Sequence, residues 1–501
     1  MQSVFYNGAP PPCPVPFNMA AYVLARGAAC PAKTALSVLG EQDWTYGDLT
    51  AAVRGTATGL LRAGLVPGDR VLMRLGNTVD FPLAYLGALA AGLVPVPTAA
   101  ALTAGDVAAM IATLNPALIL RDPDVACPDD PRVMSLDALR ALRHMPPADW
   151  HMGDPERPGY IIYTSGTSGQ PRAVVHAHRA IWARQMMFQG WYGLGAQDRM
   201  LHAGAFNWTY TLGTGLMDPW TVGATALIPA QGTAATDLPT LIADHKASIF
   251  AAAPGVYRQL LNQGEIAAMP ALRHGLSAGE KLPPATRARW EAATGTRVYE
   301  AYGMSECSTF ISASPDQPTG ADVLGRPQQG RHIALLGAQG PVDIGEEGTI
   351  AVHRSDPGLM LGYLGAPDET AAKMRGDWFL TGDQGCMDAD FQITYLGRND
   401  DMMNAGGFRV SPVEVEACLA RLEGISAVGV AEVRVKQDVT VIAAFYTGPA
   451  PLDDAALRLY AEENLARYKQ PRLFIHLPAL PMGANGKILR ARLRQQFEAS
   501  S

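Results

Sequence analysis

A loop of small, hydroxyl-bearing residues is the first stretch of this sequence whose composition could do chemistry. Within YTSGTSGQPR, residues 163–172, it presents Thr164, Ser165, Gly166, Thr167, Ser168 and Gly169. Successive backbone N–H groups in such a loop can form a nest for an anion, and Arg172 adds a cation next to it. The spacing does not fit the P-loop pattern, so a plain flexible loop stays open as the alternative. The expected ligand is a phosphate chain.

Three more charged residues stand in short stretches that contain glycine or serine. Glu306, in YEAYGMSECS, suits Mg²⁺, a hard cation that takes few carboxylates and several phosphate oxygens; an ordinary surface carboxylate is the alternative. Asp383, in TGD, has two oxygens that could accept both hydroxyls of a ribose, with an Asx-turn as the alternative. Lys487 directly follows Gly486 and stands four residues after Gly483, so a flexible loop could carry its ammonium to an anionic reaction centre.

Taken together, these stretches resemble the adenylate-forming superfamily, which includes acyl- and aryl-CoA synthetases and luciferases. The resemblance covers nearly the whole chain in the family's order and spacing, and it is carried by YTSGTSGQPR, SAGEKLP (277–283), YEAYGMSECS (299–308), WFLTGDQG (378–385), GRNDDMMNAGGFRVSPVEVE (397–416) and PMGANGKILR (481–490). The sequence looks most like the medium-chain acyl-CoA and benzoate-CoA synthetase branches. The reaction this implies is ATP-dependent: a carboxylic acid gives acyl-AMP and pyrophosphate, and CoA then gives acyl-CoA and AMP.

The resemblance implies a role for each matching residue. Lys487, Glu306 and Ser305 are the catalytic candidates, with Glu306 as the Mg²⁺ ligand and the Ser305 hydroxyl on the α-phosphate. The expected ATP and AMP contacts are Thr164, Ser165, Gly166, Thr167, Ser168, Gly169, Arg172, Gly279, Glu280, Lys281, Glu300, Ala301, Tyr302, Asp383 and Arg398. We expect Tyr302 to stack on the adenine, although an ordinary core aromatic is the alternative.

Two further sets follow from the same resemblance. Asp400 is the expected hinge residue, about which a small C-terminal domain swings between two catalytic poses. Gly406, Gly407 and Arg409 are expected to line the CoA channel, where a side chain at either glycine would block the thiol.

Some positions depart from the family's usual residues. Ser305 stands where threonine is more frequent, and Gln170 replaces a frequent lysine. Met482 and Gly483 replace part of a Pro-Arg-Thr sequence before Lys487, which makes the docking of that loop less predictable.

The acyl pocket is predicted from Phe206, Trp208, Gly303, Met304 and Thr309. Asn207 stands where amino-acid-activating relatives carry an aspartate, and Gly303 stands where acetate-specific relatives carry a tryptophan. The acid should therefore be uncharged beyond its carboxylate and larger than acetate, of medium chain length or aromatic. Core packing of Trp208 remains an equal alternative.

The elements that would position these residues alternate between helix and strand in the first third of the chain. Helix patterns in 45–64, 77–92 and 106–115 follow or precede buried strands such as 70–76 and 93–97, which predicts α/β architecture with doubly covered sheets. An uncharged run from 81 to 105 is long enough for a membrane span, but its prolines favour a buried helix and strand. We predict a large N-terminal domain of 1–398, a hinge at 399–401 and a small, mobile α+β domain of 402–501.

Composition narrows the class of protein. The 501 residues carry a net charge of −7, which argues against a nucleic-acid partner. Six dispersed cysteines and an N-terminus without signal-peptide features indicate a cytoplasmic enzyme, monomeric or homodimeric. His176 and His178 are interpreted as helix-start residues rather than metal ligands. Two alternative functions remain: a ligase that loads a carrier-protein phosphopantetheine thiol, and a non-catalytic nucleotide-binding relative, which the presence of Lys487, Glu306 and Asp383 disfavours.

Overall fold

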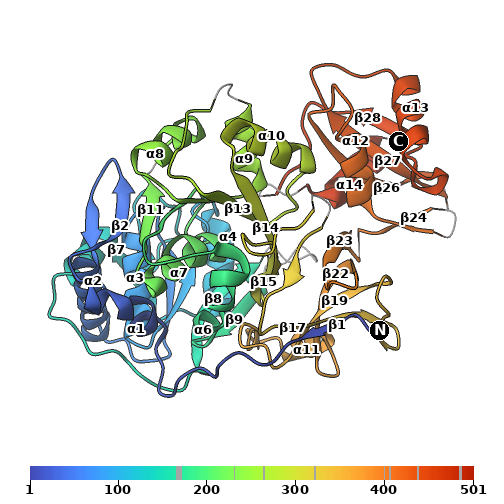
Figure 1. The fold of residues 1–501 in the computed structure, drawn as a ribbon. Coiled ribbons are helices and arrows are strands. Elements are labelled where there is room, and N and C mark those ends of the chain that lie inside the picture. Colours follow the sequence, from blue (N-terminus) through green and yellow to red (C-terminus); the bar gives the residue numbers. More distant parts are fainter. Residues whose placement is uncertain are drawn as a thin grey trace.

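The computed structural model describes residues 1–164, 172–230, 232–262, 266–320, 323–399, 401–405, 408–436, 439–483 and 488–500. The chain up to residue 399 builds one large body of several sheets, and the residues from 403 onward form a smaller lobe beside it (Figure 1).

A nine-stranded sheet lies at the centre of the large body. Its strands β14, β13, β12, β10, β11 and β2 are mutually parallel, and antiparallel strands close both ends. Across the sheet the order is β16 (Arg326–Pro327), β15 (Ser308–Ser312), β14 (Arg297–Met304), β13 (His274–Ala278), β12 (Ile249–Ala252), β10 (Arg199–His202), β11 (Thr225–Pro229), β2 (Thr34–Leu39) and β3 (Asp43–Thr45). Residues that follow the parallel strands therefore gather at one edge, where α/β proteins bind ligands.

Three smaller sheets complete the large body. One is parallel: β5 (Val94–Pro97), β4 (Arg70–Arg74), β6 (Leu118–Arg121) and β7 (Val133–Ser135). The second is antiparallel: β20 (Gly362–Tyr363), β9 (Arg172–Ala177) and β8 (Pro158–Thr164). The third, also antiparallel, contains β1 (Val4–Tyr6), β17 (His332–Gly337), β19 (Glu347–His353), β22 (Trp378–Met387) and β21 (Met374–Arg375), with β18 (Gly340–Pro341) on β17 and β23 (Ile393–Arg398) on β22.

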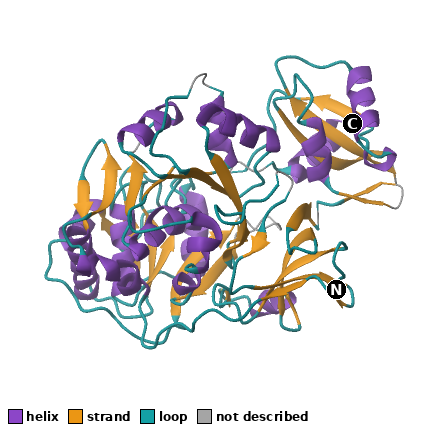
Figure 2. Cartoon of the chain, viewed as in Figure 1, coloured by secondary structure: helices purple, strands orange, loops and turns teal. Residues whose placement is uncertain are grey.

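Helices cover both faces of the central sheet (Figure 2). On one face, Phe250 of β12 packs with Tyr257 and Trp290 from two helices; on the other, Ala251 and Leu276 lie in a second core cluster. The helical segments of the large body are α1 (Met19–Leu24), η1 (Ala25–Ala29), α2 (Tyr46–Arg62), α3 (Asp80–Ala90), α4 (Ala104–Leu114), α5 (Leu136–Leu142), α6 (Ala180–Ala183), η2 (Phe188–Tyr192), η3 (Thr211–Met217), α7 (Asp218–Val222), η4 (Ala235–Asp237), α8 (Leu238–Asp244), α9 (Pro254–Leu261), α10 (Pro284–Thr294) and α11 (Pro367–Ala372). The predicted α/β class with doubly covered sheets is confirmed.

The smaller lobe is α+β. Its elements are β24 (Met403–Ala405), β25 (Phe408–Val410), α12 (Pro412–Leu419), β26 (Ala427–Lys436), β27 (Val439–Thr447), α13 (Asp454–Asn464), η5 (Arg467–Lys469), β28 (Leu473–His476) and α14 (Arg490–Ser500). Strands β26 and β27 are antiparallel, and β28 joins β27 in parallel. No sheet pairs a strand before residue 399 with one after it, within the residues described, which fits the predicted boundary; the boundary itself stays a prediction.

Local sequence signals fixed several element ends. Thr45 caps α2, because its side chain accepts the N–H of Asp48. Ser411 likewise caps α12 by accepting the N–H of Glu414. The reciprocal bond of a capping box is replaced here by an ion pair: the Glu414 carboxylate binds Lys469, with 2.5 Å between Nζ and Oε1.

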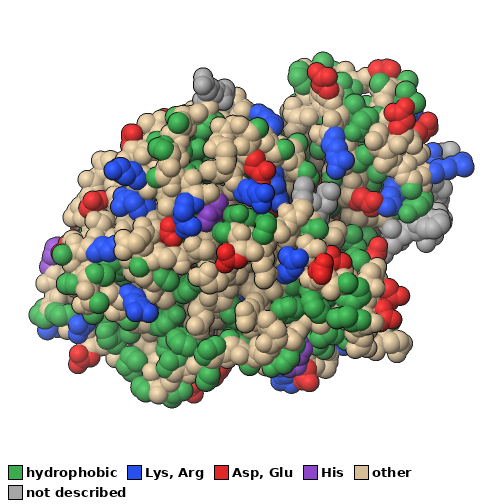
Figure 3. All heavy atoms as spheres, in the orientation of Figure 1, with side chains coloured by type: hydrophobic (Ala, Val, Ile, Leu, Met, Phe, Trp, Pro, Cys, Tyr) green, Lys and Arg blue, Asp and Glu red, His purple; other side chains and the backbone are tan. Residues whose placement is uncertain are grey.

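The uncharged run from 81 to 105 is buried from 81 to 98, in α3 and β5 as predicted, whereas 99–105 are half-buried or exposed and lead into α4. Among the described residues, none of the helices combines the length and the apolar character that a membrane crossing needs. On the face shown in Figure 3, basic and acidic side chains are interspersed rather than gathered into one basic patch.

Candidate active site

The two ends of the predicted phosphate loop are paired across β8 and β9. Thr164, the last residue of β8, lies opposite Arg172, the first residue of β9. The guanidinium of Arg172 binds Glu369, with 2.7 Å between Nη2 and Oε2, and lies 5.4 Å from the centre of the Tyr363 ring. The loop residues Ser165, Gly166, Thr167, Ser168 and Gly169, and the side chain of Thr164, lie outside the described residues.

The turn between β14 and β15 presents Ser305 and Glu306, and three contacts hold it. His176 donates from Nε2 to the carbonyl of Ser305 over 2.7 Å. The N–H of Met360 donates to the carbonyl of Glu306 over 2.8 Å. The hydroxyl of Tyr363 donates to Oε1 of Glu306 over 2.8 Å. The dipeptide predicted to bind the α-phosphate and Mg²⁺ is thus fixed through both its backbone and its carboxylate.

His176 holds this turn in its neutral form. Its ring is buried and stacked on Tyr160, with centroids 4.8 Å apart, and burial lowers the pKa of His176 to about 4. A neutral ring that donates from Nε2 carries its proton there. The interpretation of His176 as a helix-start residue is wrong, because it lies within β9; His178 lies in the turn that follows, where its Nδ1 accepts the N–H of Met19.

Asp383, the predicted ribose ligand, lies on β22 with two tyrosines around it. Tyr302 donates its hydroxyl to Oδ2, and Tyr395 donates to Oδ1 over 3.3 Å. Nη1 of Arg398 is 3.7 Å from Oδ1. Predicted nucleotide residues from β14, β22 and β23 therefore meet at one point.

Glu300 plays a different part from its neighbours. Only 2% of its surface is exposed, and its carboxylate accepts the N–H of Leu282 over 2.9 Å and binds Arg287 over 2.8 Å. Burial raises the pKa of Glu300 to about 7, which Arg287 opposes. We conclude that this carboxylate braces the 279–282 segment, so any contribution to the adenine site comes through that segment or through backbone.

The 279–281 segment lies against a predicted acyl residue. Gly279 has a φ of +99°, and a Cβ there would approach Cζ2 of Trp208 to 2.6 Å. Glycine is thus required both for the backbone and for the close approach of the indole. Glu280, the next residue in the chain, lies 3.7 Å from Arg258. Lys281 is half-buried, and Ala301 is buried on β14.

The remaining acyl candidates differ in how they are placed. Phe206 is buried in the main core, with its ring 5.9 Å from that of Phe81. Met304 and Thr309 are half-buried, and the Thr309 hydroxyl contacts Sδ of Met187 at 2.9 Å.

Gly303 has a structural reason to be glycine. A Cβ at this position would lie 2.1 Å from the carbonyl oxygen of Ser308, on the paired strand. An indole at 303 would therefore displace β15 rather than simply shorten a pocket.

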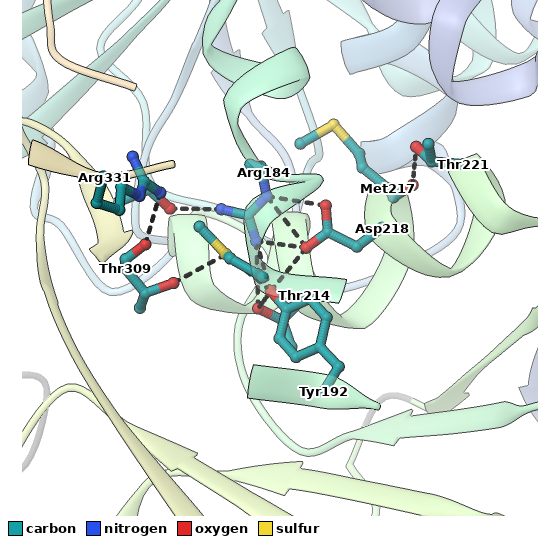
Figure 4. A network of polar contacts seen from close by, with 10 residues as sticks. Arg184, Tyr192, Thr214, Met217, Asp218, Thr221, Thr309 and Arg331 are labelled. Carbon is teal, nitrogen blue, oxygen red and sulfur yellow. Dashed lines mark hydrogen bonds and ion pairs between the residues drawn. The ribbon is translucent and has the colours of Figure 1, made fainter. Parts of the chain in front are cut away.

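A buried ion pair between Arg184 and Asp218 lies next to β15 (Figure 4). Arg184 binds Asp218 through Nε at 2.9 Å and Nη2 at 2.6 Å, and Nη1 donates to Oγ of Ser308. The hydroxyl of Tyr192 donates to Asp218 over 2.8 Å, and Thr214 lies within 3.2 Å of Nη2 of Arg184. This network joins α6, η2, η3 and α7 to the first residue of β15.

The remaining predicted residues lie outside the described part of the chain. These are Lys487, Asp400, Gly406 and Gly407; for Arg409, only the backbone is described, in β25. Their roles stay predictions.

Sequence reasoning missed Tyr363, His176, Arg184 and Asp218. Tyr363 follows a glycine in LGYLG, His176 stands two residues before His178, Arg184 precedes Gln185, and Asp218 precedes a proline. None of these settings identifies the residue's partner, because the partner comes from a distant part of the chain.

Known enzymes match this chain in sequence and in structure over most of its length. Residues 24–364 match the sequence profile described as AMP-binding enzyme, and residues 414–487 match that of the AMP-binding enzyme C-terminal domain. A 3-hydroxybenzoate–CoA ligase of Aromatoleum sp. (strain CIB) is 29% identical, over 92% of this chain and 93% of its own length. A mitochondrial acyl-coenzyme A synthetase of Homo sapiens is 28% identical, over 90% of this chain and 84% of its own. The crystal structure of a benzoate CoA ligase from Burkholderia xenovorans LB400 superposes with a TM-score of 0.86 at 27% identity, covering 95% of this chain and 100% of the other.

Proposed function

The chain belongs to the AMP-binding enzyme family, and from this premise we propose that it makes the CoA thioester of an aromatic or medium-chain carboxylic acid. The enzyme is an AMP-forming acid–thiol ligase. It first joins the acid to the α-phosphate of ATP, releasing pyrophosphate, and then transfers the acyl group from AMP to the thiol of CoA. The observation that carries the proposal is the end-to-end similarity to the 3-hydroxybenzoate–CoA ligase.

The residues around Glu306 fit the group that accompanies ATP. Mg²⁺ supplies charge neutralisation between the phosphate oxygens. Tyr363 holds one oxygen of Glu306, and among the described residues no hydrogen bond reaches the other, Oε2. Both reactants are anionic, so a cationic side chain such as Lys487 would lower the repulsion between them. Arg172 would do so after exchanging Glu369, which it binds at 2.7 Å, for phosphate. Asp383 would orient the ribose.

The proposed acid has no second charge. The guanidinium of Arg184, which binds Ser308 next to the predicted acyl residue Thr309, is already neutralised by Asp218 at 2.6 Å. A second carboxylate would lose its water without gaining an unpaired cation there, which is costly. Apolar neighbours such as Trp208 and Met304 instead favour a ring or a chain, at about 0.8 kcal/mol for each buried methylene.

A panel of acids tests this assignment. We expect kcat/KM to be highest for benzoate or hexanoate, lower for butyrate, and lowest for acetate and malonate. Differences of one methylene should be shallow, about 10- to 200-fold at most. An optimum at acetate or malonate would show that the assigned acid class is wrong.

The acceptor is tested in the same assay. AMP release that depends on free CoA is expected. A carrier-protein ligase would instead form acyl-AMP with the same acids and leave CoA unused, so the two functions give opposite results when CoA is omitted and restored.

Rotation about residue 400 is the third test. The N–H of Asn399 donates to the carbonyl of Gly382 in the large body, whereas Asp401 binds Arg494 and Arg490 of α14 at 3.0 and 3.5 Å. Asp400 stands between these two anchors. Because proline fixes φ, Asp400→Pro should leave one half-reaction intact and lose most of the other.

The matched control for this hinge variant is Asp400→Ala, which removes the carboxylate and leaves φ free. It should keep both half-reactions. Equal losses in the two half-reactions of Asp400→Pro, in a folded protein, would argue against two poses.

The compartment and assembly remain proposals. All six cysteines are free, and free thiols are typical of the cytoplasm. We propose a cytoplasmic enzyme whose partners are small molecules, as a monomer or homodimer.

A further inference from the structure

Tyr363 occupies an unusual place between two parts of the proposed nucleotide site. Its hydroxyl is 2.8 Å from Oε1 of Glu306, and its ring lies under the guanidinium of Arg172. The side chain is buried, with 6% of the residue exposed. It therefore touches both a predicted metal ligand and a predicted phosphate cation.

The backbone of Tyr363 is held as firmly as its side chain. Tyr363 pairs with Val174 across β20 and β9, and its N–H donates to the hydroxyl of Thr370 over 3.0 Å. The same segment also holds the main chain of Glu306, through the N–H of Met360. The position of the hydroxyl is therefore set by strand β9, which begins at Arg172.

The hydroxyl of Tyr363 is the donor in its contact with Glu306, because a phenol is protonated at neutral pH. A protonated phenol donates one hydrogen bond, and an ionised carboxylate accepts it. Rotation of the Glu306 carboxylate is thereby restricted, and one defined oxygen is left for a cation.

We propose that Tyr363 is a positioning residue for Glu306, holding one carboxylate oxygen so that the other faces the Mg²⁺ that accompanies ATP. This proposal rests on the role proposed above for Glu306. Groups that orient a metal ligand in this way typically contribute 10- to 100-fold in metal affinity or activity.

The test uses Tyr363→Phe, which removes only the hydroxyl, and Mn²⁺ as a paramagnetic probe for the cation. Binding of Mn²⁺ is measured by electron paramagnetic resonance in the presence of a non-hydrolysable ATP analogue. We expect the dissociation constant for Mn²⁺ to rise about 10- to 100-fold. In turnover, the Mg²⁺ concentration for half-maximal adenylation should rise in parallel.

The matched control is Tyr46→Phe. Tyr46 is also a buried tyrosine, and its hydroxyl donates to the carbonyl of Ala224, which has no predicted role in the site. It should leave Mn²⁺ affinity unchanged. An unchanged Mn²⁺ affinity in Tyr363→Phe as well would overturn the proposal.

A double-mutant cycle separates positioning from a merely structural effect. If Tyr363 acts through Glu306, adding Tyr363→Phe to Glu306→Gln should change Mn²⁺ affinity by less than about twofold. An undiminished effect in that background would also overturn the proposal. Failure of the proposed function looks different: the wild-type protein would form no acyl-AMP with any acid, whatever its Mn²⁺ affinity.

Discussion

Replacing Lys487 with alanine should abolish most acyl-adenylate formation while leaving the second half-reaction intact. In the first step, a carboxylate attacks an α-phosphate that is itself anionic, so an ammonium at that point stabilises the charge that develops in the transition state. Loss of one such group typically costs about 10²- to 10³-fold in rate. Thioester formation starts from acyl-AMP, after that charge has been redistributed, and does not need the same ammonium.

The two half-reactions can be measured separately. Adenylation is followed by pyrophosphate release without CoA, and thioester formation by CoA consumption from supplied acyl-AMP. Lys373→Ala is the control: Lys373 ends α11 and is only half-exposed, yet has no assigned role in catalysis. Adenylation within about tenfold of wild type in Lys487→Ala would remove Lys487 from the mechanism.

The elements were largely readable from the sequence because their signals are local. Thr45 and Ser411 mark helix starts through the bonds that their side chains make to backbone N–H groups three residues on. The buried helix and strand within 81–105 followed from apolar composition and proline positions. The pairing of β1 with β17 was not readable, since it joins residues more than 300 positions apart and no short-range signal records it.

The candidate site also contains residues that the sequence identified and residues that it did not. Glu306, Asp383 and Arg172 were found because they stand in short motifs with recognisable spacing. The residues that hold them were not. Tyr363 and His176 reach Glu306 and Ser305 only where separate sheets meet, and Tyr395 reaches Asp383 from the neighbouring strand of the same sheet. For Glu300 the motif suggested a nucleotide contact, whereas the fold directs its carboxylate to Arg287 and the Leu282 N–H, so the contact itself stays a prediction.

The largest expected effect on stability comes from Arg184. The side chains of Arg184 and Asp218 are 7% and 0% exposed, and their ion pair is supported by Tyr192, Thr214 and Ser308. Burial lowers the pKa of Arg184, but the charge of Asp218 more than offsets this, so the guanidinium stays ionised. Arg184→Met leaves a buried carboxylate without its counter-ion, which typically costs about 3–5 kcal/mol of unfolding free energy.

The shape of the site supports this size of effect. Gly213 of η3 lies against the guanidinium: a Cβ on it would be 2.4 Å from Cζ of Arg184. Because glycine has no side chain, η3 has nothing at this position that could fill the space left by the guanidinium. The network also holds Ser308, which has a φ of +60° and begins the strand that follows the Ser305–Glu306 turn. Loss of Arg184 should therefore lower the adenylation rate as well as the unfolding midpoint.

A surface ion pair supplies the control, and a second substitution supplies the rescue. Arg354→Met breaks a pair whose partners are 64% and 62% exposed, and we expect a change within about 0.5 kcal/mol. Arg184→Met combined with Asp218→Asn removes the orphaned charge, so it should be more stable than Arg184→Met alone. Urea unfolding of the four proteins, wild type included, measures both comparisons. Two outcomes would contradict this argument: Arg184→Met unfolds at the same urea concentration as wild type, or the double variant is less stable than Arg184→Met alone. Either result would mean that an unpaired Asp218 charge is not what destabilises the protein.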